Sequence, residues 1–304
     1  MPEPLANLVD STPRSLGSLG DVGALAYGCW RFTTSSVDDA TALINTALDH
    51  GMNLIDTADV YGFDWGGTGF GANEELLGRV LAGSPALRDR MVLATKGGIM
   101  PPVPYDSSTD GLTAACEASL RRLGVDTIDL YQVHRPDFLT HPGELAATLT
   151  ALRDAGKVRE VGISNHTPAQ HEALAAHLDF PLTSSQPEFS AATLDPMRDG
   201  TFDLCMRDGV TPLAWSPLAG GRLMTGEGVR PELIARLDAL AQREGVDRAA
   251  IAYAFVLAFP ARPVAIIGTQ DRDRVAGAGS ALGVHLDRVD VYELIVASDG
   301  EALP

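Results

Sequence analysis

Eight short apolar runs recur along the 304-residue chain, separated by stretches whose apolar residues are spaced as on an amphipathic helix. Several of the runs are apolar at nearly every position rather than alternating, which is typical of parallel strands that are buried on both faces. They cover residues 24–27, 52–55, 91–94, 127–133, 158–163, 182–186, 211–215 and 264–267. The clearest helical stretches cover residues 37–50, 73–81, 111–123 and 142–155.

Eightfold repetition of strand and helix predicts an α/β protein, a closed (β/α)8 TIM barrel. The competing architecture, a doubly wound open sheet, normally carries a Gly-x-Gly-x-x-Gly turn after an early strand. Here the first strand is followed by GCWR (28–31), which lacks that fingerprint. No linker or shift in composition interrupts the chain, so we expect a single domain over residues 1–304. We expect residues 14–22 to form a hairpin plug at the bottom of the barrel, and residues 247–259 and 286–297 to form extra helices near the C-terminus.

Composition excludes several classes of function. The net charge is −17 with no basic cluster, so we expect no binding to nucleic acid or to an anionic membrane. The N-terminal segment lacks the basic start and apolar core of a signal peptide, and the longest apolar stretch, residues 249–261, is too short to span a bilayer. Three scattered cysteines, Cys29, Cys116 and Cys205, favour reduced thiols over a disulfide framework or a zinc site. We therefore expect a cytoplasmic protein with a small-molecule substrate and no metal, either monomeric or homo-oligomeric.

Polar residues with reactive groups follow several of the strand-like runs. Asp56, Lys96 and His134 stand at the ends of the second, third and fourth runs, and Tyr61 lies five residues past Asp56. Because the ends of barrel strands meet at one face, we expect these four side chains to converge. Lysine is rare elsewhere, since only Lys96 and Lys157 among the 23 basic residues are lysines.

These four residues make chemical sense as one proton-transfer unit. The pKa of a free tyrosine is about 10, and a buried ammonium on Lys96 is expected to lower the pKa of Tyr61. Asp56 would hold that ammonium charged and in place, and a neutral His134 would hydrogen-bond the substrate oxygen. Tyr61 would then deliver a proton to a carbonyl oxygen while a hydride reaches the carbonyl carbon.

Six sequence motifs carry a resemblance to a known family. They are NLIDTADVYG (53–62), LATK (93–96), SLRRLGVDTIDLYQVH (119–134), VGISN (161–165), SQPE (185–188) and PLAWSPLAGG (212–221). With them the chain resembles the aldo-keto reductase superfamily, most of all its compact bacterial members, from about residue 17 to the helix after the last strand. The resemblance implies reversible NADPH-dependent reduction of aldehydes or ketones to alcohols. It makes Tyr61 the general acid, Asp56 and Lys96 its modulators, and His134 the orienting group.

The resemblance also implies a nicotinamide site. Ser164, Asn165 and Gln186 would hydrogen-bond the nicotinamide carboxamide, and Trp215 would lie against the ring. Phosphate binding has separate support, because barrels often build that site from the loops after strands seven and eight. These loops provide glycines for close backbone approach, backbone donors and an arginine clamp. The residues expected there are Ser216, Leu218, Gly220, Gly268, Thr269, Gln270 and Arg274.

Gly268 departs from the family's pattern, since many NADPH-preferring relatives carry lysine at this position. Without that lysine, Arg274, with Arg272 beside it, would hold the adenosine 2′-phosphate. We therefore expect NADP(H) as the cofactor, with NAD(H) possible.

Loops at the expected barrel mouth supply candidate substrate contacts. The predicted substrate-binding residues are Trp30, Met100 and Arg135, with Phe63, Trp65 and Phe138 on the same loops. The pattern specifies neither the carbonyl compound nor the favoured direction of the reaction.

Two other functions fit parts of the pattern. A metal-dependent barrel hydrolase would need ligands clustered as in His-x-His, and none of the seven histidines has that spacing. A dinucleotide-binding redox sensor or accessory subunit with little turnover would use the same barrel, because a fold alone does not choose between enzyme and sensor.

Overall fold

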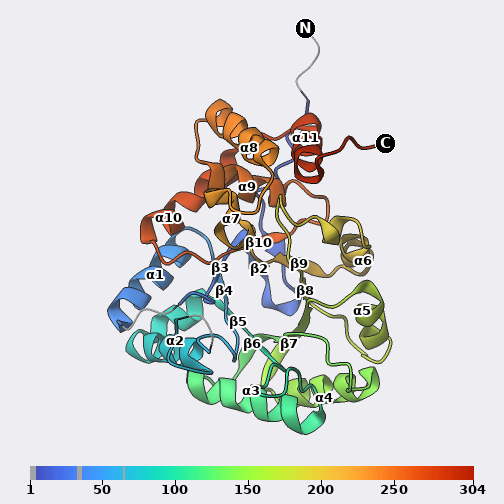
Figure 1. The fold of residues 1–304 in the computed structure, drawn as a ribbon. Helices are drawn as coiled ribbons and strands as arrows, with labels where there is room; N and C mark the ends of the chain where they lie inside the picture. The colour runs from blue at the N-terminus through green and yellow to red at the C-terminus, as the bar shows by residue number, and fades with distance from the viewer. Residues whose placement is uncertain (1–4, 33–35, 64–65) are drawn as a thin grey trace.

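The computed structural model describes residues 5–32, 36–63 and 66–304, so Trp65 lies outside the described residues. Eight parallel strands close into a barrel in the order β10-β3-β4-β5-β6-β7-β8-β9, and helices surround it (Figure 1). The predicted (β/α)8 TIM barrel is therefore confirmed.

The predicted strands and helices all appear, with ends shifted by no more than a few residues. The barrel strands are β3 (Leu25–Gly28), β4 (Leu54–Asp56), β5 (Val92–Gly97), β6 (Ile128–Val133), β7 (Val158–Ser164), β8 (Ser184–Gln186), β9 (Thr211–Ala214) and β10 (Val264–Ile267). The α-helices are α1 (Val37–Asp49), α2 (Ala72–Gly83), α3 (Thr109–Leu123), α4 (Pro142–Asp154), α5 (Pro168–Ala175), α6 (Thr201–Asp208), α7 (Arg222–Thr225), α8 (Pro231–Glu244), α9 (Arg248–Leu257), α10 (Arg272–Gly277) and α11 (Arg288–Asp299). The 3₁₀ turns are η1 (Gly17–Leu19), η2 (Pro85–Arg90), η3 (Asp195–Met197), η4 (Ala219–Gly221) and η5 (Ala278–Gly283).

Two strands run further than the apolar pattern indicates. β4 ends on Asp56 and β5 continues to Gly97, so Asp56 and Lys96 lie within strands rather than after them. The register pairs Lys96 with Gln132 of β6. Since side chains alternate along a strand, these three polar residues share the inward face with the apolar residues two positions earlier. Those apolar residues belong to the cluster inside the barrel: Leu54, Ala94 and Leu130.

The predicted hairpin closes the amino-terminal end of the barrel. β1 (Arg14–Ser15) and β2 (Asp21–Val22) pair antiparallel around η1. Leu16 and Val22 are fully buried and belong to the same cluster as the inward residues of the barrel strands. The hairpin thus acts as an apolar plug, and the opposite end of the barrel is left for polar side chains.

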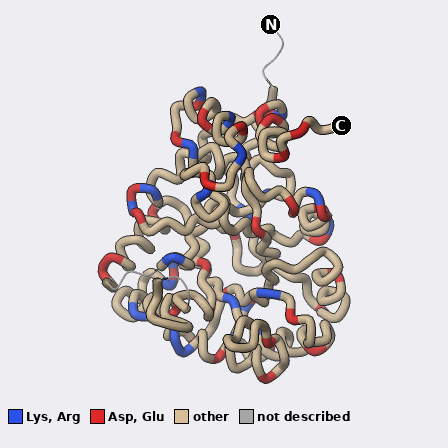
Figure 2. The backbone as a smooth tube through the Cα atoms, in the orientation of Figure 1, with Lys and Arg blue, Asp and Glu red and all other residues tan. Residues whose placement is uncertain are grey.

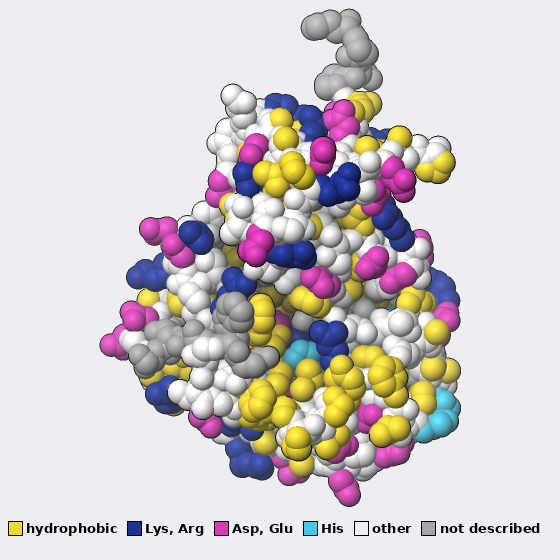
Figure 3. Space-filling model, viewed as in Figure 1, with side chains coloured by type: hydrophobic (Ala, Val, Ile, Leu, Met, Phe, Trp, Pro, Cys, Tyr) yellow, Lys and Arg dark blue, Asp and Glu magenta, His cyan; other side chains and the backbone are white. Residues whose placement is uncertain are grey.

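Charge is spread over the outside of the molecule. Figure 2 shows acidic and basic positions intermingled along the outer helices. On the face seen in Figure 3, hydrophobic side chains gather around a hollow in which a histidine lies beside a basic side chain. Of the helices that the structure describes, none is long and apolar enough to cross a membrane.

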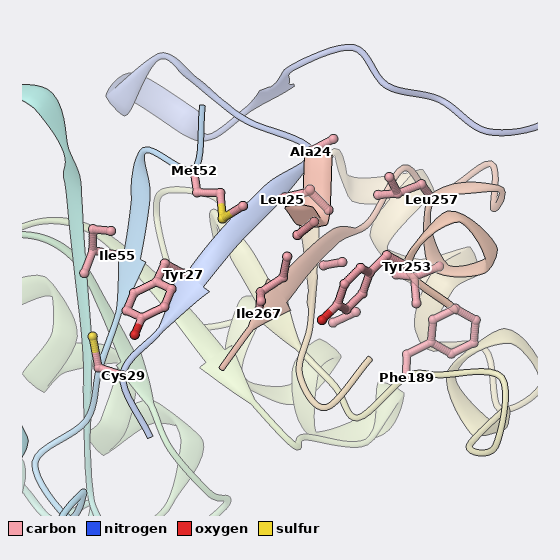
Figure 4. Packing of buried hydrophobic residues seen from close by; sticks show 14 of the residues in the cluster. Ala24, Leu25, Tyr27, Cys29, Met52, Ile55, Phe189, Tyr253, Leu257 and Ile267 are labelled. Atoms are coloured by element: carbon pink, nitrogen blue, oxygen red, sulfur yellow. The ribbon is translucent and has the colours of Figure 1, made fainter. Parts of the chain in front are cut away.

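The larger core fills the space between the strands and the helices. Figure 4 shows side chains of β3, β4 and β10 packed beside those of α9. The last eight residues of α9, from Ala250 to Leu257, are buried without exception, and Asp247 caps its start by accepting the N–H of Ala250 at 2.8 Å. α9 and α11 are the extra helices that the sequence predicts near the C-terminus.

Candidate active site

Three strands and one loop bring Asp56, Tyr61, Lys96 and His134 together at the carboxyl end of the barrel. Asp56 ends β4, and Lys96 is the next-to-last residue of β5. His134 directly follows β6, and its N–H donates to the carbonyl of Gly97 at 2.9 Å. Tyr61 lies on the loop between β4 and α2.

The ammonium of Lys96 is the hub of this group. It is fully buried and donates to Asp56 Oδ2 at 2.6 Å, to the Thr57 carbonyl at 2.9 Å and to Tyr61 Oη at 3.1 Å. An ammonium has three N–H donors, so these contacts satisfy all of them. Lys96 therefore joins the carboxylate to the phenol through its own charge.

The loop that carries Tyr61 is fixed by backbone contacts. The N–H of Asp59 donates to the Lys96 carbonyl at 3.0 Å, which ties the loop to β5. Just past Tyr61 the backbone turns at Gly62, with a φ of 94° and so little space that a Cβ would lie 2.8 Å from that of Ala72. Only glycine fits this turn without strain, and the turn holds the phenol against the lysine.

The start of α2 anchors the same region from outside the barrel. The side chain of Asn73 donates to the Cys29 carbonyl at 2.6 Å. Glu74, fully buried, accepts the Thr95 hydroxyl at 2.6 Å and pairs with Arg122 at 2.7 Å. Thr95 is the neighbour of the buried lysine, so α2 and α3 both brace the end of β5.

Burial and charge act in opposite directions on the pKa values of Tyr61 and Lys96. Burial raises the pKa of the phenol, and the nearby ammonium offsets only part of this, so the pKa lies above its ordinary value. The expectation of a net lowering is wrong, because desolvation is the larger effect. Burial lowers the pKa of Lys96, but Asp56 and Tyr61 together outweigh burial, so that pKa is raised and the ammonium stays charged.

His134 lies beside the phenol as a neutral ring. Its ring centroid is 5.7 Å from that of Tyr61, with the planes at 78°. Burial, together with the charges of Lys96 and Arg135, holds the pKa of the imidazole well below its ordinary value. Its Nδ1 is buried without a hydrogen-bond partner in the described part of the chain. A neutral imidazole in this position has one N–H to donate to a bound carbonyl oxygen.

The residues expected at the nicotinamide carboxamide form one connected group. The Trp215 indole N–H donates to Asn165 Oδ1 at 2.9 Å, and the Asn165 amide donates to the His134 carbonyl at 3.2 Å and to Ser164 Oγ at 2.8 Å. Ser164 Oγ donates to the Gln186 carbonyl at 2.9 Å. Asn165 has a φ of 59°, a left-handed conformation that is uncommon for non-glycine residues but easier for asparagine than for most.

Gln132 is a residue of this site that the sequence analysis missed. Its side-chain amide donates to Asp56 Oδ1 at 3.1 Å, and the amide of Gln186 donates to the same oxygen at 3.0 Å. The signal for Gln132 was present in the alternation of β6, because it lies two residues before His134 and therefore on the same face.

The loop after β9, where the sequence predicts phosphate contacts, is a tight turn. Four of its residues have positive φ values, three of them consecutive, so the backbone turns tightly there. The residues with positive φ are Ser216 (51°), Ala219 (51°), Gly220 (69°) and Gly221 (102°). Leu218 lies inside this turn and accepts the N–H of Gly221 at 2.9 Å, and Arg31 donates to the Gly220 carbonyl at 2.8 Å.

The loop after β10 begins at Gly268, which lies close to β3. The Tyr27 hydroxyl donates to the Thr269 carbonyl at 3.2 Å, and the Gln270 amide donates to the same hydroxyl at 3.3 Å. Gln270 Oε1 is buried without a partner among the described residues. This oxygen can accept from a bound group.

The start of α10 is already capped by the chain itself. Asp271 Oδ1 accepts the N–H groups of Asp273 at 2.9 Å and Arg274 at 3.2 Å, so these donors are used internally. Arg272 donates to the Thr46 hydroxyl at 3.4 Å. The side chain of Arg274 is 78% exposed and 3.6 Å from Asp271, which leaves it able to reach a phosphate.

The three predicted substrate contacts lie on loops that follow β3, β5 and β6. Trp30 is partly exposed just after β3, and Met100 forms an isolated bridge with Val103. The Arg135 guanidinium lies 6.0 Å from the centroid of the Trp215 ring, beside the candidate nicotinamide site. Within the described ranges, no group of three or more His, Cys, Asp or Glu side chains is arranged to hold a metal ion.

Comparison with known proteins places this chain in a family. The sequence matches the aldo/keto reductase family over residues 24–295. The chain therefore belongs to the aldo/keto reductase family, which consists of oxidoreductases that use nicotinamide cofactors.

Two curated relatives span nearly the whole chain. It is 49% identical to a 6-dehydroglucose reductase from Novosphingobium aromaticivorans, covering 96% of this chain and 97% of the relative. It is 34% identical to a 6-dehydroglucose reductase from Agrobacterium fabrum, covering 92% and 96%.

Solved structures agree on the fold. A glycerol dehydrogenase from Gluconobacter oxydans is 27% identical, with a TM-score of 0.82 over 97% of this chain and 98% of that one. An aldo/keto reductase from Klebsiella pneumoniae in complex with NADP and acetate is 24% identical, with a TM-score of 0.77 over 94% of both chains.

The buried position of His134 predicts its protonation state. We expect its imidazole to stay neutral at pH values at which a free imidazole is protonated, because burial and two neighbouring cations disfavour the charged form. The unfolded chain takes up this proton near pH 6.5 and the folded chain does not, so the free energy of unfolding falls as the pH drops below about 6.5. An NMR titration, with the His134 signals assigned by their loss in His134→Gln, checks the first point. A midpoint at or above 6.5 would contradict it.

Proposed function

We propose that this protein reduces the aldehyde of a 6-dehydro sugar, with 6-dehydroglucose as the first substrate to test. Support comes from the two relatives of that name, one of them 49% identical over almost the entire chain. The buried group of Asp56, Tyr61, Lys96 and His134 supplies the acid that such a reduction needs. The contact between Lys96 and Tyr61 is the single observation that carries the chemistry.

In this proposal Tyr61 is the general acid. Its raised pKa keeps the phenol protonated at neutral pH, ready to donate to a carbonyl oxygen. As the proton leaves, negative charge grows on Oη, 3.1 Å from the ammonium of Lys96. Lys96 thus stabilises the charge that develops during the reaction. The neutral ring of His134, whose centroid lies 5.7 Å from that of Tyr61, would hold the same carbonyl oxygen in place by donating a hydrogen bond to it.

The residues present also suit a dinucleotide cofactor, which we propose to be NADPH. When bound, NADPH supplies the hydride that reaches the carbonyl carbon. Ser164, Asn165 and Gln186 would hold its carboxamide, and Trp215 would lie against the ring. The tight turn at residues 216–221, whose glycines let a ligand approach the backbone closely, would hold phosphate oxygens. Arg274 would meet the 2′-phosphate in place of the lysine missing at position 268.

We also propose a reducing compartment such as the cytoplasm. All three cysteines are buried and unpaired: Cys29 follows β3, Cys116 lies in α3 and Cys205 lies in α6. The fold therefore contains no disulfide bond that an oxidising compartment would have to maintain.

Removal of the phenolic hydroxyl tests the chemistry. Tyr61→Phe keeps the ring and its packing but removes the proton, so kcat with 6-dehydroglucose and NADPH should fall by about 10²- to 10⁴-fold. NADPH affinity, measured by protein fluorescence, should change little. Tyr61→Phe protein that turns over at the wild-type rate would remove the phenol from the mechanism, and wild-type protein inactive on 6-dehydroglucose but active on other aldehydes would reject only the substrate.

The choice of cofactor is tested at Arg274. Arg274→Ala should lower the ratio of NADPH to NADH catalytic efficiency by about tenfold, because a charge-assisted contact to the 2′-phosphate is lost. The matched control is Arg207→Ala on α6, an exposed arginine that pairs with Glu172 and lies outside the loops expected to hold the cofactor. If wild-type protein uses NADH more efficiently than NADPH, our preference for NADPH is overturned.

A further inference from the structure

Gln132 lies where the proton-donating group and the cofactor-binding group meet. It is fully buried on the inward face of β6, in register with Lys96 of β5. On its other side β6 pairs it with Gly162 of β7, and β7 pairs Gly162 with Ser184 of β8. A Cβ at Gly162 would lie 2.1 Å from Ser184 Oγ and 3.2 Å from Gln132 Cγ. The missing side chain at 162 thus opens the space in which Gln132 reaches across to β8.

Both the nitrogen and the oxygen of the Gln132 amide have partners that fix its orientation. The NH₂ group donates to Asp56 Oδ1 at 3.1 Å. The carbonyl oxygen accepts Gln186 at 3.2 Å and the Ser184 hydroxyl at 3.4 Å. Rotating the amide by half a turn would set its oxygen against the carboxylate and its NH₂ against another NH₂. The network therefore permits a single orientation.

That orientation also determines how Gln186 is presented. One N–H of Gln186 donates to Asp56 Oδ1 at 3.0 Å and the other to Gln132 Oε1 at 3.2 Å. With both hydrogens used, the carbonyl oxygen is the group that Gln186 offers elsewhere. A carboxamide bound beside Ser164 and Asn165 would therefore donate its own NH₂ to Gln186.

We propose that Gln132 is a positioning residue that couples the carboxamide site to the proton donor, by orienting Gln186 and Asp56 at once. This inference rests on the proposed function. Asp56 Oδ2 faces the ammonium of Lys96 at 2.6 Å, and Oδ1 faces the two amides. Their N–H dipoles offset part of the carboxylate charge and hold it in line with the ammonium.

The effect on proton donation follows from the charges around the phenol. The titratable groups that act on Tyr61 are Lys96, Asp56 and Cys29, and the neutral His134 lies beside its ring. The carboxylate favours the protonated phenol, and the ammonium favours the phenolate. Loss of the Gln132 donor leaves more of the carboxylate charge unscreened. The phenol then becomes a weaker acid, and the pH at which it ionises rises.

Two variants of similar size test this. Gln132→Met fills the space but removes donor and acceptor, so kcat should fall about tenfold, since one hydrogen bond to a charged group is lost. NADPH should bind several-fold more weakly by fluorescence, and the alkaline limb of the kcat profile should move to higher pH. Gln132→Glu, when protonated, restores one donor and one acceptor. Its deficit relative to wild type should therefore shrink as the pH falls. Gln242→Met, on the exposed face of α8, is the control.

Two results would overturn the proposal. One is wild-type kcat and NADPH affinity in Gln132→Met. The other is an equal loss in both variants at every pH, with an unmoved alkaline limb and a lower thermal unfolding midpoint, which would show a packing role alone. If wild-type protein reduces no carbonyl compound, the proposed function fails. In that case NADPH binding alone tests the role of Gln132: weaker binding in Gln132→Met supports the coupling, and unchanged binding rejects it.

Discussion

A buried ion pair between Lys96 and Asp56 organises the polar end of this barrel. Removing two charges from water is costly unless every donor and acceptor is satisfied. Here the ammonium uses all three N–H groups, and the carboxylate accepts the ammonium on one oxygen and two amides on the other. The residues that complete this pair, Tyr61, Gln132 and Gln186, are those that face the reaction. The same side chains therefore satisfy the buried charges and position the proton donor.

The barrel makes this arrangement possible because it divides its interior into two parts. Toward the amino-terminal end, Leu16 and Val22 of the hairpin plug pack on inward apolar residues of the strands. Toward the carboxyl end, the next inward positions are polar and come from strands far apart in the chain. The contact between Asp56 and Gln186 spans 130 residues of sequence. Because the barrel closes, the Gln186 amide nitrogen nevertheless lies 3.0 Å from Asp56 Oδ1.

Much of this was predictable from sequence, and the reasons for success and failure are physical. Short, largely apolar runs separated by amphipathic stretches indicate a parallel barrel, and polar residues at the strand ends are expected to meet at one face of it. Gln132 was missed because it lies inside a strand-like run. The alternation along a strand shows that its side chain points inward, but it does not show that this side chain contacts Asp56 and Gln186 on other strands. The net direction of the Tyr61 pKa was also wrong, since sequence reveals the ammonium but not the extent of burial.

The central claim is that the charge on Lys96 stabilises the phenolate that Tyr61 becomes, and Lys96→Met tests this most directly. The measurement is the pH dependence of kcat, in variant protein shown to bind NADPH and to unfold near the wild-type temperature. We predict that kcat at neutral pH falls by about 10²-fold or more and that the alkaline limb moves to higher pH. A Lys96→Met enzyme with the wild-type kcat and an unmoved alkaline limb would contradict the account.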